Sequence, residues 1–161
     1  DPDATLHYLA RMLDAGEDPM FIARRIVIQS SEDVGLANSD ALKVAVAAMN
    51  AVHQIGMPEA RIILAQAALT VALSPKSNTS YRGINKAMED VRTKDVGQVP
   101  MHIRNAAAQG MEEFGYGEGY KYPHDYKFGK VEQQYLPDKL INEKYFEPRE
   151  WENFYEEEEQ E

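Results

Sequence analysis

The sequence predicts an all-α protein, a helical bundle of about six helices followed by an extended, aromatic-rich arm. Apolar residues between positions 1 and 114 recur at spacings of three and four, the repeat of a helix with one buried side. Residues that start and stop helices separate these segments. After Gly115 neither helical nor strand periodicity continues, although aromatic residues remain frequent. We therefore expect a bundle at 1–114, a Tyr- and Gly-rich arm at 115–148 that packs on the bundle, and a disordered acidic tail at 149–161.

The first two predicted helices each begin with an aspartate followed by a proline. Asp1 and Asp18 can cap the free N–H groups of a first turn, and proline suits the first helical position because it lacks an N–H. The first helix is expected over 2–15, and the second runs from Pro19 to before Gly35. One side of each is apolar, formed by Leu6, Leu9, Met12 and Leu13 in the first and by Phe21, Ile22, Ile26 and Ile28 in the second.

Two further helices, at 39–55 and 58–73, are rich in alanine and apolar on nearly every side. A helix of that composition is buried on most sides, so we expect both at the centre of the bundle or beneath another subunit. Their connection, Gly56-Met57, is short enough to make them antiparallel neighbours. The candidates for this core and subunit contact are Val46, Met49, Ile62, Ile63, Leu69 and Leu73.

The fifth predicted helix, at 78–94, has a much narrower apolar side. Its apolar residues are spaced by three, four and three positions, which is typical of a seam that packs on one partner helix. They are Tyr81, Ile84, Met88 and Val91. Gly97 and Pro100 then interrupt the pattern, and a short sixth helix is expected at 105–114.

Composition and charge exclude several classes of protein. The chain of 161 residues carries a net charge of −10, of which −6 falls in 149–161 and leaves −4 for the rest. A protein that binds nucleic acid mainly through electrostatic attraction would carry a net positive charge.

The chain has no cysteine, which excludes disulfides, thiolate chemistry and cysteine zinc sites and suits a reducing cytosol. No stretch approaches the about 20 apolar residues of a membrane span. Because the chain begins with Asp1, we expect it to be a piece of a longer protein.

The arm contains motifs that resemble chemical sites but lack their spacing. GYGEG at 115–119 is glycine-rich, yet it has neither the phosphate-loop spacing nor the strand and helix of a dinucleotide fold. His124 and Asp125 could be metal ligands, but a metal needs three or four, and His7, His53 and His102 lie on separate elements. We therefore predict no catalytic, cofactor-binding or metal-binding residue and no enzyme activity for this chain.

Two interpretations of the arm remain open. Its aromatic residues alternate with lysines, as in surfaces that stack the bases of single-stranded nucleic acid. However, 115–148 holds five lysines and six acidic residues. We therefore expect the rings to pack on the helices, through Tyr116, Tyr120, Tyr122 and Tyr126. The residues that could contact nucleic acid, if the alternative holds, are Arg24, Arg25, Arg104 and Lys121; each arginine could equally form a salt bridge or cap a helix.

Several stretches, in this order, resemble the C-terminal region of the replication-associated recombination protein A family, also called MgsA. The family's members are AAA+ ATPases related to clamp loaders and to the Werner-helicase-interacting protein. The resemblance covers residues 1 to about 148. The stretches are DPDATLHYLARMLDAGEDPMFIARRIV (1–27), SSEDVGLANSDAL (30–42), GMPEARIILAQAALTVALSPKSN (56–78), VPMHIRNA (99–106), GYGEGYKYPHD (115–125) and QQYLPDKL (133–140).

The resemblance implies an oligomerisation domain that resembles the collar of a clamp loader and forms a homotetramer. It also implies that the parent protein is bacterial, cytoplasmic and associated with the nucleoid. It places ATP and Mg in an upstream AAA+ module. It also implies that the parent protein acts in replication-fork restart and recombination, with DNA and single-strand binding protein as partners. Gln109-Gly110-Met111-Glu112 and Glu118 stand where basic residues are expected in relatives, which weakens any DNA contact of the arm. The alternative function is a module that binds DNA or protein, and a third, a small-molecule enzyme, would require a deep pocket of ionisable side chains.

Overall fold

The computed structural model describes residues 1–104, 115–150 and 152, and this part of the chain contains five α-helices, short helical turns and no strand. The prediction of an all-α fold is therefore confirmed. The chain forms two compact units, Asp1–Asn85 with Tyr145–Glu161 and Lys86–Lys144. The sixth helix predicted at 105–114 lies outside the described residues.

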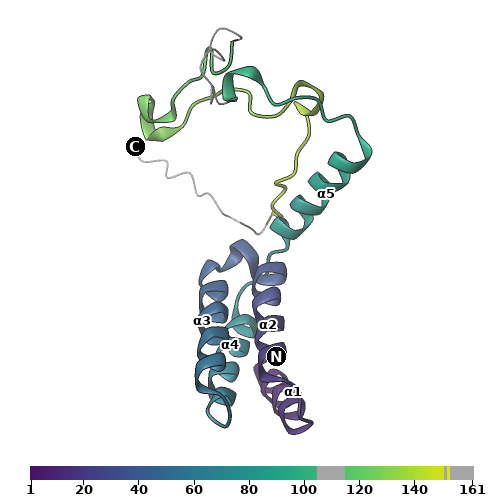
Figure 1. Ribbon diagram of the computed structural model, residues 1–161, viewed down its shortest axis with the longest axis vertical. Helices are drawn as coiled ribbons and strands as arrows, with labels where there is room; N and C mark the ends of the chain where they lie inside the picture. The colour runs from purple at the N-terminus through teal and green to yellow at the C-terminus, as the bar shows by residue number, and fades with distance from the viewer. Residues whose placement is uncertain (105–114, 151, 153–161) are drawn as a thin grey trace. The chain divides into compact units, whose positions relative to one another are not determined.

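The first unit is built around a bundle of four helices that pack against one another (Figure 1). They are α1 (Pro2–Asp14), α2 (Pro19–Gln29), α3 (Ser39–Ile55) and α4 (Ala60–Leu73). Helix α4 packs against the other three, and α2 also packs against α3. All four helices contribute to one buried cluster, formed by Leu9, Ile22, Ala23, Val52, Ala60 and Leu64. A second, smaller buried cluster is formed by Val34, Ala41 and Val71.

The two predicted N-terminal caps form hydrogen bonds to the first turns of their helices. Asp1 Oδ1 accepts from the N–H of Ala4 at 2.9 Å. The Asp18 carboxylate accepts from two N–H groups, those of Met20 at 3.0 Å and Phe21 at 3.1 Å. These side chains satisfy donors that a first turn leaves free. Helix α4 begins two residues later than the predicted position 58, because residues 57–59 form a turn.

Two short turns between α2 and α3 were not predicted from the sequence. A π-helical turn, η1 (Ser30–Val34), continues α2 and is followed by a 3₁₀ turn, η2 (Gly35–Ala37). Gly35 has φ +48°, and a Cβ there would lie 2.7 Å from the carbonyl oxygen of Ser77. The N–H of Ser77 donates to the carbonyl of Asp33 at 2.7 Å. Only glycine fits this close approach between η2 and the segment after α4.

The fifth helix, α5 (Thr79–Thr93), is lined on one side by the C-terminal strap, which we define as residues 143–150 and 152. Three hydrogen bonds fix the pairing: Thr79 Oγ1 donates to Glu152 Oε2 at 2.7 Å, Arg82 to the carbonyl of Glu147 at 2.8 Å, and Lys86 to the carbonyl of Lys144 at 2.6 Å. Residue numbers fall along the strap as they rise along α5, so the two segments are antiparallel. A Cβ at Gly83 would lie 2.6 Å from the carbonyl oxygen of Tyr145, and glycine is therefore needed for this approach.

Glu152 lies within 149–161, the stretch predicted from its composition to be a disordered tail. Its side chain is instead buried, at 8% exposure. Besides the bond from Thr79, Glu152 Oε2 accepts from the N–H of Arg149 at 2.6 Å. Burial alone would raise the pKa of this carboxyl, but the hydrogen bonds from Ser77, Arg149 and Thr79 together hold its pKa below the usual value. The anchored part of the chain therefore extends at least to Glu152.

The second unit, Lys86–Lys144, consists of the end of α5 and a series of short 3₁₀ turns: η3 (Met101–Ile103), η5 (Pro123–Asp125), η6 (Lys127–Gly129) and η7 (Asp138–Leu140). Within this unit the ammonium group of Lys94 lies 2.9 Å from carboxylate oxygens of both Asp90 and Glu143. Hydrogen bonds to Glu143 and Asp90 raise the pKa of Lys94. Among the described helices, none is both long and apolar enough to cross a bilayer.

Candidate self-association surface

Helices α3 and α4 pack closely because their buried sides consist mainly of alanine. The buried residues are Ala41, Ala45, Ala48 and Val52 on α3, and Ala60, Leu64, Ala67 and Val71 on α4. Small side chains allow two helix backbones to approach, and alanine loses no side-chain entropy when it is ordered. The predicted antiparallel pairing of these helices is present.

The outward sides of the two helices differ in composition. On α3 the exposed side mixes the polar Lys43, Asn50 and Gln54 with apolar residues such as Val46, which is 37% exposed. On α4 most residues opposite the buried stripe are apolar: Ile62 is 61% exposed, Leu73 is 68% exposed and Leu69 is half-buried. Their spacing of seven and four places them in one row along the helix, in which the exposed Gln66 is the polar member. We call this row, Ile62, Leu69 and Leu73, the α4 face.

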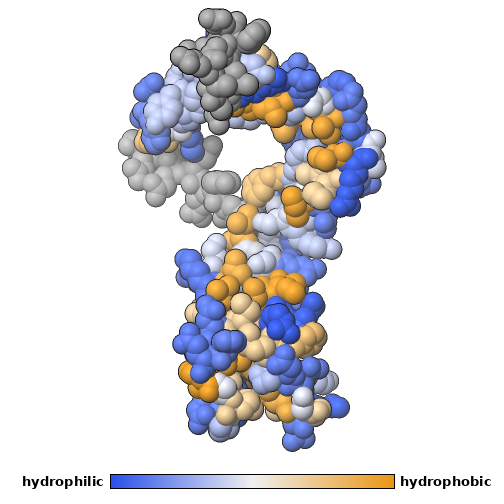
Figure 2. All heavy atoms as spheres, viewed as in Figure 1, coloured by the Kyte–Doolittle hydropathy of each residue, from blue (hydrophilic) through white to orange (hydrophobic). Residues whose placement is uncertain are grey.

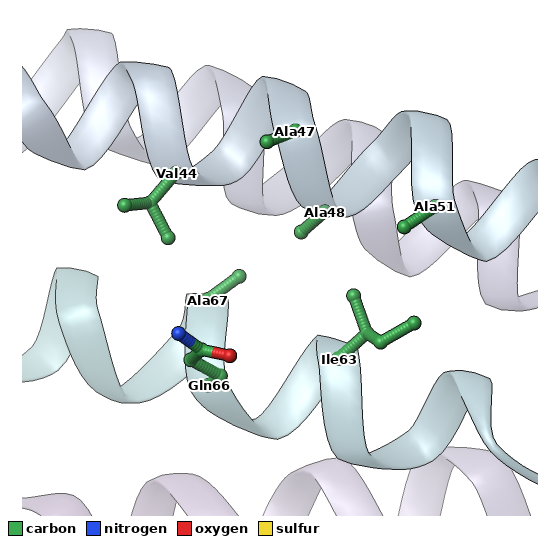
Figure 3. A pocket seen from close by; sticks show the side chains of 7 residues that line it. All are labelled: Val44, Ala47, Ala48, Ala51, Ile63, Gln66 and Ala67. Carbon is green, nitrogen blue, oxygen red and sulfur yellow. The ribbon is translucent and has the colours of Figure 1, made fainter.

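An apolar groove lies on each side of α4. The groove towards α3 has a volume of about 320 Å³ and is lined by Val44, Ala47, Ala48, Ala51, Ile63, Gln66 and Ala67. Figure 3 shows these side chains around the space between the two helices, with the Gln66 amide as the one polar side chain among them. The groove towards α1 has a volume of about 430 Å³ and includes Leu6, Leu13 and Ala65. The α4 face is thus a ridge between two apolar grooves.

The surface of the bundle mixes hydrophobic and hydrophilic residues (Figure 2). Isolated apolar side chains are normal on a protein surface and require no explanation. A mainly apolar ridge with a groove on either side is different, because ridges and grooves of this size are how helices pack on one another. The α4 face therefore has the shape and chemistry of a helix-packing surface.

The six residues predicted for the core and subunit contact fall into two groups. Met49 and Ile63 pack against the buried cluster of the bundle, so they belong to its own core. Ile62, Leu69 and Leu73 form the α4 face, and Val46 on α3 is 37% exposed. Both helices were predicted to be apolar on nearly every side. In the structure the most exposed large apolar side chains of the pair, Ile62 and Leu73, lie on α4.

The four predicted nucleic-acid contacts are not gathered into one site by hydrogen bonds or ion pairs among the described residues. Arg24 forms an exposed ion pair with Asp18 at 3.5 Å, and Arg25 is exposed on the same helix. Arg104 donates to the carbonyl of Val99 at 2.6 Å, and its guanidinium lies 5.7 Å from the centre of the Tyr116 ring. A salt bridge or a helix cap was the alternative role predicted for each arginine.

Lys121 is held by the segment that follows η6. Its ammonium group donates to the carbonyl of Glu132 at 3.0 Å. The side-chain amide of Gln133 bonds the backbone of Lys121 in both directions, accepting from its N–H at 3.2 Å and donating to its carbonyl at 2.9 Å. The amide therefore acts as a clamp that joins the two sides of a loop.

The arm exposes most of its rings. Tyr116 is half-buried, whereas Tyr120, Tyr122 and Tyr126 are 44%, 53% and 42% exposed. Phe128, in the left-handed region at φ +60°, is 82% exposed. The packing of these tyrosines on the bundle stays a prediction. Within the described residues no group of three or more histidines and carboxylates is placed to hold a metal.

The comparisons with known proteins support one another. A family model described as the MgsA AAA+ ATPase C-terminal region matches residues 1–161. An uncharacterised AAA domain-containing protein of Mycobacterium tuberculosis is 51% identical over 148 residues, which cover 92% of this chain and 33% of that protein. The replication-associated recombination protein A of Bacillus subtilis is 46% identical over 149 residues, covering 92% of this chain and 35% of that protein.

A eukaryotic relative, the ATPase WRNIP1 of Dictyostelium discoideum, is 40% identical over 148 residues, covering 91% of this chain and 17% of that protein. The chain spans about a third of the length of the bacterial relatives just named. The match therefore concerns one region of these longer proteins, and that region includes the bundle, α5 and the strap. On this evidence the chain belongs to the family of MgsA AAA+ ATPase C-terminal regions.

Proposed function

We propose that this chain is the self-association domain of an AAA+ ATPase that acts in replication-fork restart and recombination, and that it forms a homotetramer. The α4 face carries the proposal, because an apolar ridge between two grooves suits the packing of a second bundle. Relatives of the chain bear the name replication-associated recombination protein A, which supports the process. In this proposal the parent protein is a cytoplasmic, nucleoid-associated protein whose partners are DNA and single-strand binding protein.

The proposal gives this chain no catalytic role. ATP and Mg belong to an AAA+ module upstream of the bundle, and the present chain holds several such modules together. Closed cyclic and dihedral assemblies of identical chains are the usual result of such self-association. The tetramer would therefore fix how many ATPase modules act together on one DNA structure.

The solution mass of the chain tests this proposal. We expect the 161-residue chain to have four times its monomer mass of 18.2 kDa in sedimentation equilibrium at micromolar concentration. The double variant I62K/L73K places two charges on the α4 face and should reduce the mass to that of a dimer or monomer. Both side chains are largely exposed, so the bundle itself should remain folded.

The matched control is N50K/Q54K, which adds the same two charges to the polar side of α3. It should leave the mass unchanged. A wild-type chain that is monomeric up to high concentration would contradict the proposal. So would an I62K/L73K variant that keeps the wild-type mass.

A second candidate function is contact with single-stranded DNA through the arm. The observation that favours it is the exposure of Tyr120, Tyr122, Tyr126 and Phe128, with Lys121, Lys127 and Lys130 beside them in the sequence. Exposed rings can stack bases, with each stacked base worth about 1–3 kcal/mol. The near-neutral charge of the arm implies modest affinity with a shallow dependence on salt.

Fluorescence anisotropy with a labelled oligothymidine measures this contact. If the arm binds DNA, Y122A/F128A should weaken binding at least tenfold while the melting temperature stays within a degree of wild type. Removal of two stacked bases corresponds to that loss. The variant R24A/R25A, on a helix of the bundle, is the comparison for binding by charge alone. Absence of binding by the wild-type chain at low salt would contradict this candidate.

A further inference from the structure

A polar cavity of about 270 Å³ lies at the start of α5, within the first unit of the chain. It differs from the two grooves beside α4, because charged and polar side chains line it. One of them comes from η1, three from the segment between α4 and α5, and two from the strap: Asp33, Lys76, Ser77, Asn78, Arg149 and Glu152. The cavity is separate from the α4 face and from the arm.

One oxygen of the Glu152 carboxylate is bound and the other is not. Oε2 accepts from the hydroxyl of Thr79 at 2.7 Å and from the N–H of Arg149 at 2.6 Å. Oε1 is also buried, but it accepts no hydrogen bond from the described residues. Glu152 is 8% exposed and its pKa is lowered, so it is a buried, ionised carboxylate at neutral pH. A buried charge of this kind requires a donor or cation at each oxygen.

A second oxygen of the cavity lacks a donor as well. Oδ1 of the Asn78 side chain is buried and, in the part of the chain that the structure describes, receives no hydrogen bond. Natural proteins pair the large majority of their buried polar atoms, so two unpaired acceptors in one cavity require an explanation. Because both atoms are acceptors, the group that completes the cavity is a hydrogen-bond donor or a cation.

The cations that line the cavity do not supply this group. The ammonium group of Lys76 donates to carbonyls at the end of α4, those of Val71 at 2.8 Å and Ala72 at 3.3 Å. If Lys76 moved into the cavity, these helix-terminal carbonyls would lose their donor. The charge of Arg149 helps to lower the pKa of Glu152, but the Arg149 side chain does not donate to Oε1. The donor therefore comes from outside these two side chains.

The acceptors of the cavity favour a single ammonium group. Ca²⁺ takes about 6–8 oxygen ligands, and among the described residues no group of three histidines or carboxylates is placed to hold a metal. Lys76 and Arg149 also oppose a double charge more than a single one. A guanidinium has five N–H donors, more than these acceptors satisfy, whereas an ammonium has three, of which the third can meet the carboxylate of Asp33. Water would satisfy the hydrogen bonds but not the charge, and charge-assisted bonds are stronger.

We infer that this cavity binds a primary ammonium group, which donates to Oε1 of Glu152 and to Oδ1 of Asn78. A free amine and a lysine side chain present the same –NH₃⁺ group, and either can be its source. Glu152 lies on the strap and Asn78 precedes α5, so the bound group joins these two segments. Because the α4 face and the arm take no part in the site, the inference is independent of the proposed function.

Amide chemical shifts of the 161-residue chain measure this binding. The probe is methylammonium, which replaces tetramethylammonium at constant total salt, because tetramethylammonium has the same charge but no N–H donor. The amide signals of Thr79 and Arg149, whose residues both bond Glu152, should shift and saturate. The expected dissociation constant is on the order of 10 mM, near the limit for a ligand of two non-hydrogen atoms.

Two variants each alter one of the unpaired acceptors. N78A removes Oδ1 and E152Q removes the negative charge, and each should weaken methylammonium binding at least tenfold. The matched controls are N50A on α3 and E150Q on the strap, which change exposed side chains outside the cavity and should bind as wild type does. Because Oδ1 of Asn78 has no donor to lose, N78A should melt within a degree of wild type when no amine is present.

N-Acetyl-lysine methylamide distinguishes the two sources of the ammonium group. If it binds more tightly than methylammonium, the cavity takes a lysine side chain, since contacts to the rest of that residue then add to the binding. Equal or weaker binding assigns the cavity to a small free amine. Either result, with the loss of binding in N78A, supports the inference.

The remaining outcomes overturn it. Larger shifts of the same amide signals with Mg²⁺ or K⁺ than with methylammonium would assign the cavity to a metal ion. No saturable shift with any cation would mean that ordered water alone completes the two acceptors. An N78A variant that binds methylammonium as wild type does would place the binding elsewhere. If N78A melts several degrees lower without amine, the Asn78 amide already serves the fold, and the cavity needs no ligand.

Discussion

Replacement of Leu64 by alanine is expected to lower the free energy of unfolding by about 3 kcal/mol. Leu64 is 0% exposed and belongs to the buried cluster that joins all four helices of the bundle. Its neighbours in that cluster include Ala23 and Ala60, whose methyl side chains are too short to fill the space that the leucine leaves. The deletion therefore removes burial and also leaves a cavity, and both effects act in the same direction.

Urea denaturation at one fixed protein concentration measures this effect, since self-association makes apparent stability depend on concentration. The matched control is L36A, the same deletion at a leucine of η2 that is 45% exposed and lies outside the α4 face. We expect L36A to change the free energy of unfolding by no more than about 0.5 kcal/mol. If the two variants were equally destabilised, Leu64 would not be at the centre of the core.

Replacement of Glu152 by alanine should cost about 3 kcal/mol, since it removes the acceptor of buried hydrogen bonds. Thr79 is 1% exposed, and its hydroxyl would lose the acceptor at 2.7 Å; the N–H of Arg149 would lose its acceptor at 2.6 Å. In E152Q an amide oxygen can take the place of Oε2, so a smaller loss is expected. The exposed neighbour Glu150 offers the control E150A, which should be neutral. A neutral E152A would show that the strap does not stabilise the unit.

The same carboxylate predicts how stability depends on pH. The pKa of Glu152 is lowered in the folded chain, so the unfolded chain takes up the proton more readily. The stabilisation by Glu152 is therefore complete above the ordinary glutamate pKa of about 4.3 and is lost as the pH falls through the lower, folded value. Denaturation midpoints of wild type and E152Q, measured from pH 7 down to pH 3, should converge at the acidic end. Parallel curves would contradict this prediction.

Local signals explain why the bundle could be predicted from its sequence. The Asp-Pro pairs at positions 1 and 18 specify helix starts through contacts within four residues, and apolar spacing specifies the buried side. The π-helical turn at Ser30–Val34 has no comparable signal. It depends on the approach of Ser77 to Gly35, and that approach exists only after α4 is in place.

The strap could not be predicted for a related reason. Two of its bonds to α5 are accepted by main-chain carbonyls, of Glu147 and Lys144, which any residue supplies. Another depends on Glu152, one glutamate within an acidic run that has the composition of a solvated tail. Composition cannot distinguish a single buried carboxylate from its exposed neighbours.

For the candidate surface, the sequence predicted two apolar helices but not which residues of each point outward. Both α3 and α4 are rich in alanine, and a count of polar residues makes them look alike. The outward residues are identified only when each helix is oriented by its buried residues. Lys43, Asn50 and Gln54 then point outward on α3 beside Val46, whereas Ile62, Leu69 and Leu73 do so on α4 beside Gln66.

The bond between Thr79 and Glu152 joins residues 73 positions apart, and this has a consequence for synthesis on the ribosome. Chains elongate at about 5–20 residues per second, so the first turn of α5 waits several seconds for its acceptor. During that interval the four bundle helices can already close on their own core, because all their residues precede Thr79. The junction at the start of α5 is therefore completed late, and a nascent chain truncated before Glu152 would display a folded bundle with an unfinished end.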